Sequence, residues 1–272
     1  MDIFKALILG IVQGITEFMP ISSSAHLVIL PKILNWPYWG KAFDVALHLG
    51  TFLAIILYYR KEILALIKAF FASLFERRLG RDPMRRLSWL LLLSAIPAAL
   101  GGVLLDKVIE EKLSSVALIA LLLILFAFLL RLADQKGKKT ASLNNVGIQE
   151  AIFIGLAQVL ALFPGVSRSG VTMTAALALG LKREAAADFS FLMSLPVVGG
   201  AALYEGLKLM KAGLPDLAAF PFVTGILASA AAGYLSIRFL RNFLSRRTFL
   251  PFVIYRWLLG AALLGWFFLS KQ

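Results

Sequence analysis

Two short polar segments interrupt otherwise apolar sequence, and their residue types are those that bind phosphate groups and divalent cations. The first is QGITEFMPISSSAH at residues 13–26, and the second is PGVSRSG at residues 164–170. Acidic, basic and hydroxyl side chains are costly in such a setting and usually serve a function there. We therefore interpret the two segments as halves of one polar site.

Gln13 and Glu17 lie four residues apart, so a helix places both side chains on one face, one turn from each other. A carboxylate and an amide oxygen at this spacing could hold Mg²⁺ or Ca²⁺, with phosphate oxygens and water completing the shell. The alternative is a protonated or hydrogen-bonded Glu17 that only joins two helices. The spacing alone does not distinguish these two interpretations.

A run of three serines, Ser22, Ser23 and Ser24, places a hydroxyl group within one helical turn of His26. A serine hydroxyl becomes a good nucleophile when a base takes its proton. His26 could be this base, or its imidazole could itself attack phosphorus. The alternative is a serine-rich helix cap followed by a histidine bonded to a backbone carbonyl. The attacking group is therefore Ser23, a neighbouring serine or His26.

The second polar segment has the features of an anion site at a helix N-terminus. Pro164 and Gly165 end one helix, and Ser167 can cap the next, whose first amide groups then face an anion. Arg168 adds a planar, permanently charged fork suited to phosphate oxygens. A structural ion pair between Arg168 and Glu17 is the alternative. The predicted substrate-binding residues of both segments are Gln13, Ser22, Ser24, Ser167, Ser169 and Gly170.

Asp44, His48 and Arg256 are further polar residues at the margins or in the interior of apolar segments. We expect them at most to contact the residues of the site rather than the substrate. His48 could line the cavity, or its ring could be bonded within the fold without a role in the site. Tyr255 and Arg256 could equally anchor a helix at the membrane interface.

The composition is that of an all-α polytopic membrane protein. Hydrophobic residues make up 60% of the 272 residues, whereas 45 to 50% is usual in soluble domains. The formal charge of +13 then indicates basic cytoplasmic loops and contact with anionic lipids rather than with nucleic acid. Cysteine is absent from the sequence, which excludes disulfides, a thiol nucleophile and cysteine-ligated metal.

The second polar segment repeats the first at a constant offset of 145 residues. We interpret this pattern as an internal repeat; chance similarity of two hydrophobic segments is the alternative. The matching pairs are Gly10 and Gly155, Gln13 and Gln158, Phe18 and Phe163, Ser22 and Ser167, and Ser24 and Ser169.

Each repeat is predicted to consist of a re-entrant helical hairpin, broken at its polar segment, followed by three transmembrane helices. An odd number of spans separates the hairpins, so the repeats should be inverted. The first repeat is residues 1–133, with a hairpin at 3–34 and spans at about 43–59, 87–105 and 116–132. A cytoplasmic linker follows at 134–147. The second repeat is residues 148–272, with a hairpin at 148–181 and spans at about 189–210, 217–240 and 251–269.

The distribution of lysine and arginine predicts the orientation of the chain. Most of the 28 basic residues fall in segments that this topology puts on one side, and cytoplasmic loops carry such an excess. We therefore expect the first hairpin to open outward and the second inward, with their tips meeting near the midplane. Residues 61–76 have the pattern of an amphipathic helix at the interface. The basic segments are 60–86, 131–139, 182–183 and 238–247.

Together, QGITEFMPISSSAH and PGVSRSG resemble the two signature motifs of the bacterial undecaprenyl-diphosphate phosphatase family, also called the bacitracin-resistance family. The resemblance covers essentially the full chain, including FDVALHLG, DFSFLMSLP and SRRTFLPFVIYRWLLG. It implies a hydrolase of the bacterial cytoplasmic (inner) membrane whose active site faces the outer, periplasmic side. The enzyme would remove the terminal phosphate of undecaprenyl diphosphate, recycling the lipid carrier of peptidoglycan synthesis and giving bacitracin resistance.

The resemblance also implies roles for single residues and a divalent cation as cofactor. Glu17 and Gln13 match the metal motif, in which glutamine is the weaker ligand of the two permitted types. Ser23 matches the proposed nucleophile, and His26 and Arg168 match the essential histidine and arginine. We therefore expect Ser23, assisted by His26, to attack the terminal phosphorus while Arg168 and the nearby amides bind its oxygens. A homodimer is a further expectation from the family.

A polyprenyl-phosphate transporter or flippase is the rival prediction, because inverted repeats with broken helices are transporter architecture. A serine-rich site with an arginine could bind phosphate without cleaving it. His26 beside the serines favours catalysis, since transport requires no nucleophile and no base.

Overall fold

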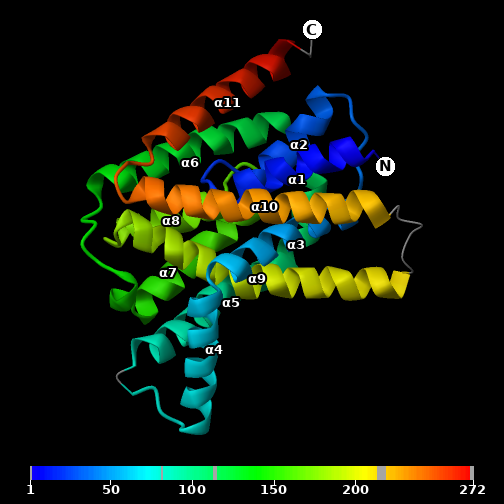
Figure 1. Cartoon of the computed structure of the whole chain (residues 1–272). Helices are drawn as coiled ribbons and strands as arrows, with labels where there is room; N and C mark the ends of the chain where they lie inside the picture. The colour runs from blue at the N-terminus through cyan, green and yellow to red at the C-terminus, as the bar shows by residue number, and fades with distance from the viewer. Residues whose placement is uncertain (1, 81, 113–114, 213–218, 270–272) are drawn as a thin grey trace.

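The computed structural model describes residues 2–80, 82–112, 115–212 and 219–269 and folds them into one bundle of helices (Figure 1). Within these residues, six helices are long and apolar enough to cross a membrane. The prediction of an all-α polytopic membrane protein is thereby confirmed. The six helices are α3 (Lys41–Tyr58), α5 (Pro83–Lys112), α6 (Val116–Lys136), α9 (Arg183–Ala212), α10 (Ala219–Leu244) and α11 (Leu250–Leu269).

These six helices lie on the predicted spans but extend beyond several of the predicted ends. The second span is predicted to end at residue 105, with DKVIEEK at 106–112 as a short turn, and this turn is wrong because α5 continues as helix to Lys112. The sequence DKVIEEK contains neither glycine nor proline and is therefore compatible with helix. The start predicted for the fifth span, residue 217, lies outside the described residues.

Two pairs of short helices flank the polar segments, at the positions predicted for the hairpins. The first pair is α1 (Ile3–Phe18) and α2 (Ser23–Ile33). The second is α7 (Ile148–Val159) with the short 3-10 helix η2 (Leu160–Leu162), followed by α8 (Arg168–Ala178). The 16 residues of α1 reach about 24 Å, which is less than the roughly 30 Å of a hydrocarbon core.

The two breaks have the same local backbone geometry. Ser22 and Ser167 cap α2 and α8, and their φ angles of 73° and 74° are uncommon for residues other than glycine. In each break the cap hydroxyl accepts from the amide three residues on, at 3.4 and 3.1 Å. The hydroxyls of Ser24 and Ser169 lie 3.2 and 3.3 Å from the respective cap hydroxyl. Residues 145 apart in the sequence therefore also share the same local backbone structure. The inverted orientation of the two repeats stays a prediction.

Each hairpin packs on a long helix from the other half of the chain. Helix α1 lies along α10 (Figure 1), where a Cβ on Gly14 would come within 2.6 Å of the Ser229 carbonyl oxygen. Helix α7 packs on α5 in the corresponding way, with Gly155 against the backbone of Ser94. At these two crossings the helix backbones are in contact and leave no room for a side chain. Each half of the chain is thereby packed against the other, and the two polar breaks meet inside the bundle.

Helix α4 (Arg60–Phe75) lies at one end of the bundle and crosses the direction of α9 and α10 (Figure 1). It buries Leu66 and Ala69 and exposes Ile67, Phe71 and Phe75. This two-faced distribution is the form expected of an interfacial amphipathic helix.

The segment predicted as a polar linker, 134–147, is only partly solvent-exposed. Helix α6 continues to Lys136, and Asp134 is 2% exposed. The Asp134 carboxylate accepts hydrogen bonds from the Arg183 guanidinium and from the Phe249 amide just before α11. This carboxylate pairs a cation and caps a helix, so the first residue of the predicted linker is packed within the bundle.

Candidate active site

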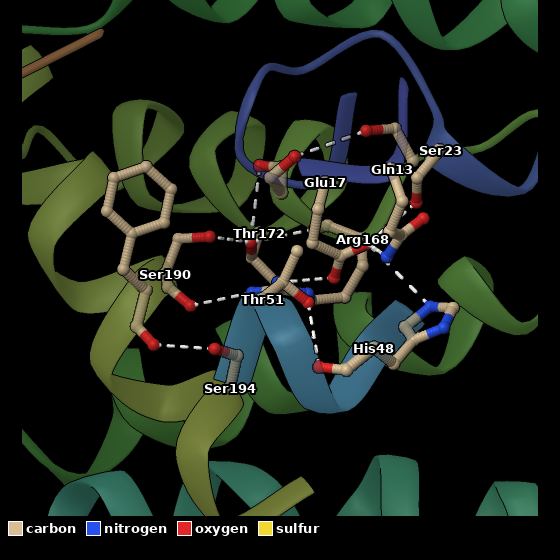
Figure 2. Close-up of polar contacts among 12 residues, drawn as sticks. Gln13, Glu17, Ser23, His48, Thr51, Arg168, Thr172, Ser190 and Ser194 are labelled. Carbon is tan, nitrogen blue, oxygen red and sulfur yellow. Dashed lines mark hydrogen bonds and ion pairs between the residues drawn. The ribbon is translucent and has the colours of Figure 1, made fainter. Parts of the chain in front are cut away.

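The carboxylate of Glu17 is the centre at which the two polar segments meet (Figure 2). Its Oε1 accepts from Arg168 Nη2 at 2.9 Å, across the two hairpins. Its Oε2 accepts from Ser23 Oγ at 2.7 Å and from Gln13 Nε2 at 3.1 Å. The structure thus brings together residues from α1, α2 and α8 that the sequence analysis assigned to one site.

Arg168 is the first residue of α8, and its guanidinium bridges α1 and α9. While Nη2 binds Glu17, Nη1 donates to the Ser190 carbonyl at 3.0 Å. Thr172 fixes the turn beneath it, donating to the Arg168 carbonyl at 2.8 Å and lying 2.7 Å from the Ser190 hydroxyl. The side chains of Arg168 and Glu17 are 15% and 7% exposed, so each charge depends on the other for compensation.

His48, expected to support the site, faces the Glu17 carboxylate from α3. Its Nε2 lies 3.8 Å from Glu17 Oε2, and its side chain is 38% exposed, so it lines the more open side of the cluster. Its Nδ1 donates to the Asp44 carbonyl at 2.8 Å. The Asp44 carboxylate itself accepts from Tyr38 at 2.8 Å. Asp44 therefore orients His48 through its backbone, and its own carboxylate bonds elsewhere.

His26 lies in a different arrangement from the one expected. Its Nδ1 is 2.7 Å from the Ser22 carbonyl oxygen and its Nε2 is 2.6 Å from the Tyr255 hydroxyl. The Ser23 hydroxyl bonds to Glu17, so Glu17 is the base that it contacts. The imidazole folds back along α2 onto the carbonyl four residues earlier, which turns it toward α11. A catalytic role for His26 stays a prediction.

The other predicted phosphate ligands lie mostly within helix caps and contacts between the hairpin tips. Ser167 caps α8 by accepting from the Gly170 amide, so this amide is engaged in the cap rather than free for an anion. Ser169 is 1% exposed and donates to the Met19 carbonyl at 3.1 Å, joining the two tips. Ser22 is buried as the cap of α2, and Ser24 is exposed. Phosphate binding by these residues stays a prediction.

Arg256 is fully buried, which excludes the interfacial anchor for this residue. Its guanidinium donates to the carbonyls of Leu123 at 3.1 Å and Pro20 at 3.2 Å. It also donates to those of Gly165 and Val166, both at 3.0 Å. One side chain on α11 therefore ties both hairpin breaks to α6.

The sequence analysis missed hydroxyl groups on α8 and α9 that lie beside Arg168 (Figure 2). Thr172 and Ser190 form the hydrogen-bonded pair described above, whereas Ser194 donates to the Phe191 carbonyl of its own helix at 2.6 Å. Ser190 and Ser194 are 1% and 0% exposed. Ser190 and Ser194 are spaced four residues apart in an apolar span. This spacing was a usable signal, because it puts two hydroxyls on one helix face.

The described residues fit a divalent cation held jointly with phosphate. No group of three or more His, Asp or Glu side chains gathers at one point in the described part of the chain. Glu17 offers carboxylate oxygens, and the Oε1 of Gln13 is buried without a hydrogen-bond partner among the described residues. Mg²⁺ is commonly held by one or two carboxylates together with substrate phosphates and water. The donor set therefore suits a hard cation whose shell a substrate completes.

The arrangement combines a hydroxyl bonded to a carboxylate, a guanidinium fork and oxygen ligands for a cation. A hydroxyl with an adjacent base is the usual form of an activated oxygen nucleophile. Guanidinium groups and metal ions are the usual means of stabilising charge on a transferring phosphoryl group. The geometry is therefore suited to phosphoryl transfer.

Comparisons with known proteins agree with this chemistry. The model of the family described as Bacitracin resistance protein BacA matches residues 6–262. The chain is 50% identical over 261 residues to the undecaprenyl-diphosphatase of Geotalea daltonii, covering 96% of each chain. It is 49% identical over 266 residues to that of Pelobacter propionicus, covering 97% of each, and 46% identical over 269 residues to that of Geobacter sulfurreducens, covering 98% and 99%. The chain therefore belongs to the Bacitracin resistance protein BacA family.

Proposed function

We propose that this protein is an undecaprenyl-diphosphatase of the bacterial inner membrane. It hydrolyses undecaprenyl diphosphate to undecaprenyl phosphate and inorganic phosphate, recycling the lipid carrier of peptidoglycan synthesis and giving bacitracin resistance. The names of relatives that match nearly the whole chain support this activity. The observation that carries the proposal is the Ser23 hydroxyl, 2.7 Å from a carboxylate that Arg168 holds in place.

In the proposed reaction, Arg168 binds oxygens of the diphosphate and the Ser23 hydroxyl attacks its terminal phosphorus. The Glu17 carboxylate takes the proton of Ser23 as the new P–O bond forms. The bond from this phosphorus to the bridging oxygen breaks, and undecaprenyl phosphate leaves. Water then attacks the phosphoserine, the P–O bond to Ser23 breaks, and Glu17 returns its proton to the Ser23 oxygen as inorganic phosphate forms. Any part that His26 takes in these proton transfers must use Nε2, because its Nδ1 is bonded to a backbone carbonyl.

Mg²⁺ or Ca²⁺ would be held by the Glu17 carboxylate and the Gln13 Oε1, together with the diphosphate. When bound, this cation supplies charge neutralisation at the phosphate oxygens. The buried Oε1 of Gln13 without a partner among the described residues supports this placement.

On the family resemblance, we propose that the site faces the outer side of the membrane. The basic segments lie near the ends of α3 and α10 and near the start of α9. These three helix ends are together at one end of the bundle (Figure 1). The positive-inside rule assigns that end to the cytoplasm. The homodimer that the family resemblance implies is retained as an expectation.

The test is phosphate release from undecaprenyl diphosphate by purified protein in detergent. The parent is assayed with Mg²⁺ or Ca²⁺ and again with a chelator, and His26→Ala is assayed beside it. Release that requires both the cation and His26 would support the proposal. If the folded parent releases no phosphate, the proposal is wrong and polyprenyl-phosphate transport becomes the better interpretation.

A further inference from the structure

The two nitrogens of His26 have different partners, which defines the tautomer of its ring. Nδ1 faces the Ser22 carbonyl oxygen, which can only accept, so Nδ1 carries a hydrogen. In the neutral imidazole, Nε2 then holds the lone pair. Any proton transfer or attack by His26 must therefore use Nε2.

The lone pair of Nε2 is occupied by a phenol from the far end of the chain. The Tyr255 oxygen lies 2.6 Å from Nε2, and the tautomer requires that the hydroxyl donates. The two rings are stacked, with their planes 10° apart and their centroids 5.7 Å apart. Tyr255 thus fixes both the position and the rotation of the imidazole.

Tyr255 is held at this position mainly through its neighbour in sequence. Tyr255 is 41% exposed, so the contacts of its own ring constrain its position only weakly. Arg256, the next residue on α11, donates to carbonyls in both hairpin breaks, including that of Pro20 just before the cap of α2. This clamp sets where α11 lies relative to α2 and therefore where the Tyr255 hydroxyl meets His26.

We propose that Tyr255 is a positioning residue for His26, and that its hydroxyl holds Nε2 unprotonated and directed at α11. The effect of Tyr255 on turnover rests on the proposed phosphatase function, whereas its effect on the reactivity of His26 does not. Without the hydroxyl, the ring keeps the Ser22 bond but loses the group that covers Nε2.

The first experiment measures the reactivity of His26 directly. Diethyl pyrocarbonate acylates unprotonated imidazole nitrogen, and the chain has 2 histidines, so His48 is an internal reference in the same sample. In Tyr255→Phe, we expect His26 to be modified about tenfold faster, because one hydrogen bond no longer protects Nε2. The rate at His48 should not change. Mass spectrometry of the two peptides reads both rates.

The outcomes of this experiment are distinct. An unchanged rate at His26 overturns the proposal, because the hydroxyl then does not cover Nε2. Equal acceleration at both histidines also overturns it, because it indicates a general loosening of the fold. The control is Leu258→Ala on the same helix, a side chain that is 67% exposed and should affect neither rate.

The second experiment follows turnover of undecaprenyl diphosphate by Tyr255→Phe. We expect kcat to fall about tenfold with KM nearly unchanged, because the hydroxyl aligns His26 without holding the substrate. An unchanged kcat would overturn the positioning role in the reaction. If the parent releases no phosphate, the proposed function fails, and the modification rates still decide whether Tyr255 controls His26.

Discussion

The ion pair of Glu17 and Arg168 can be tested by removing first one charge and then both. Glu17→Gln keeps the shape of the side chain but leaves the guanidinium, 15% exposed, without its carboxylate. Breaking a buried pair in this way typically costs about 3 to 5 kcal/mol of unfolding free energy. Because Arg168 keeps its bond to the Ser190 carbonyl, we expect a loss near the lower end, about 3 kcal/mol.

The double variant Glu17→Gln with Arg168→Gln removes the uncompensated charge. Its stability should return to within about 1 kcal/mol of the parent, because no uncompensated charge is then left buried. Its activity should not return. Loss of charge stabilisation at the phosphoryl group should keep kcat at least about 100-fold below the parent.

The assay pairs unfolding of the purified protein in detergent with phosphate release by the same samples. The control is the pair of Arg85 and Glu76, in which Glu76 is 55% exposed and Arg85 16%. Glu76→Gln should have little effect on unfolding and leave kcat unchanged, because an exposed carboxylate keeps its hydration when its partner is lost. A double variant that is both stable and fully active would refute the reasoning, because the pair would then be only a structural link.

Three further changes test the cation, the nucleophile and the packing of the second break. Gln13→Glu should lower the Mg²⁺ concentration that gives half-maximal phosphate release, because a second carboxylate strengthens the site; an unchanged requirement would place the cation elsewhere. Ser23→Ala should reduce kcat at least about 100-fold, and turnover at the parental rate would exclude Ser23 as nucleophile. Gly170→Ala puts a Cβ 2.9 Å from Arg256 Nη1 and should lower the free energy of unfolding by about 1 to 3 kcal/mol, measured by thermal unfolding. The control is Gly200→Ala, whose Cβ would have no atom within 4 Å and should not lower the stability.

The hairpin breaks could be located from sequence because their physical causes are local. Pro20 in one segment and the Pro164–Gly165 pair in the other disfavour continuation of a helix, and a serine that follows two residues after Pro20 or Gly165 can cap the next helix. The meeting of Glu17 with Arg168 could be expected as well, because each charge requires a partner in apolar surroundings.

The partners of Arg256 could not be predicted, because all of them are backbone carbonyls. Every residue carries a carbonyl group, so the sequence gives no signal for the four that converge on this guanidinium. The direction of His26 was equally out of reach. Whether the ring faces Ser23 or Tyr255 depends on one side-chain torsion and on the placement of α11, far along the chain.

The shared geometry of the two breaks has an evolutionary consequence. At the same offset as the caps, Ser23 of the first break corresponds to Arg168 of the second, and Glu17 corresponds to Leu162. Two identical copies of the first half would bring two acids together without a cation, and two copies of the second would bring two cations together without an acid. Each half therefore supplies the counter-ion of the other. Selection must keep the halves unlike at these positions while keeping them alike at the caps.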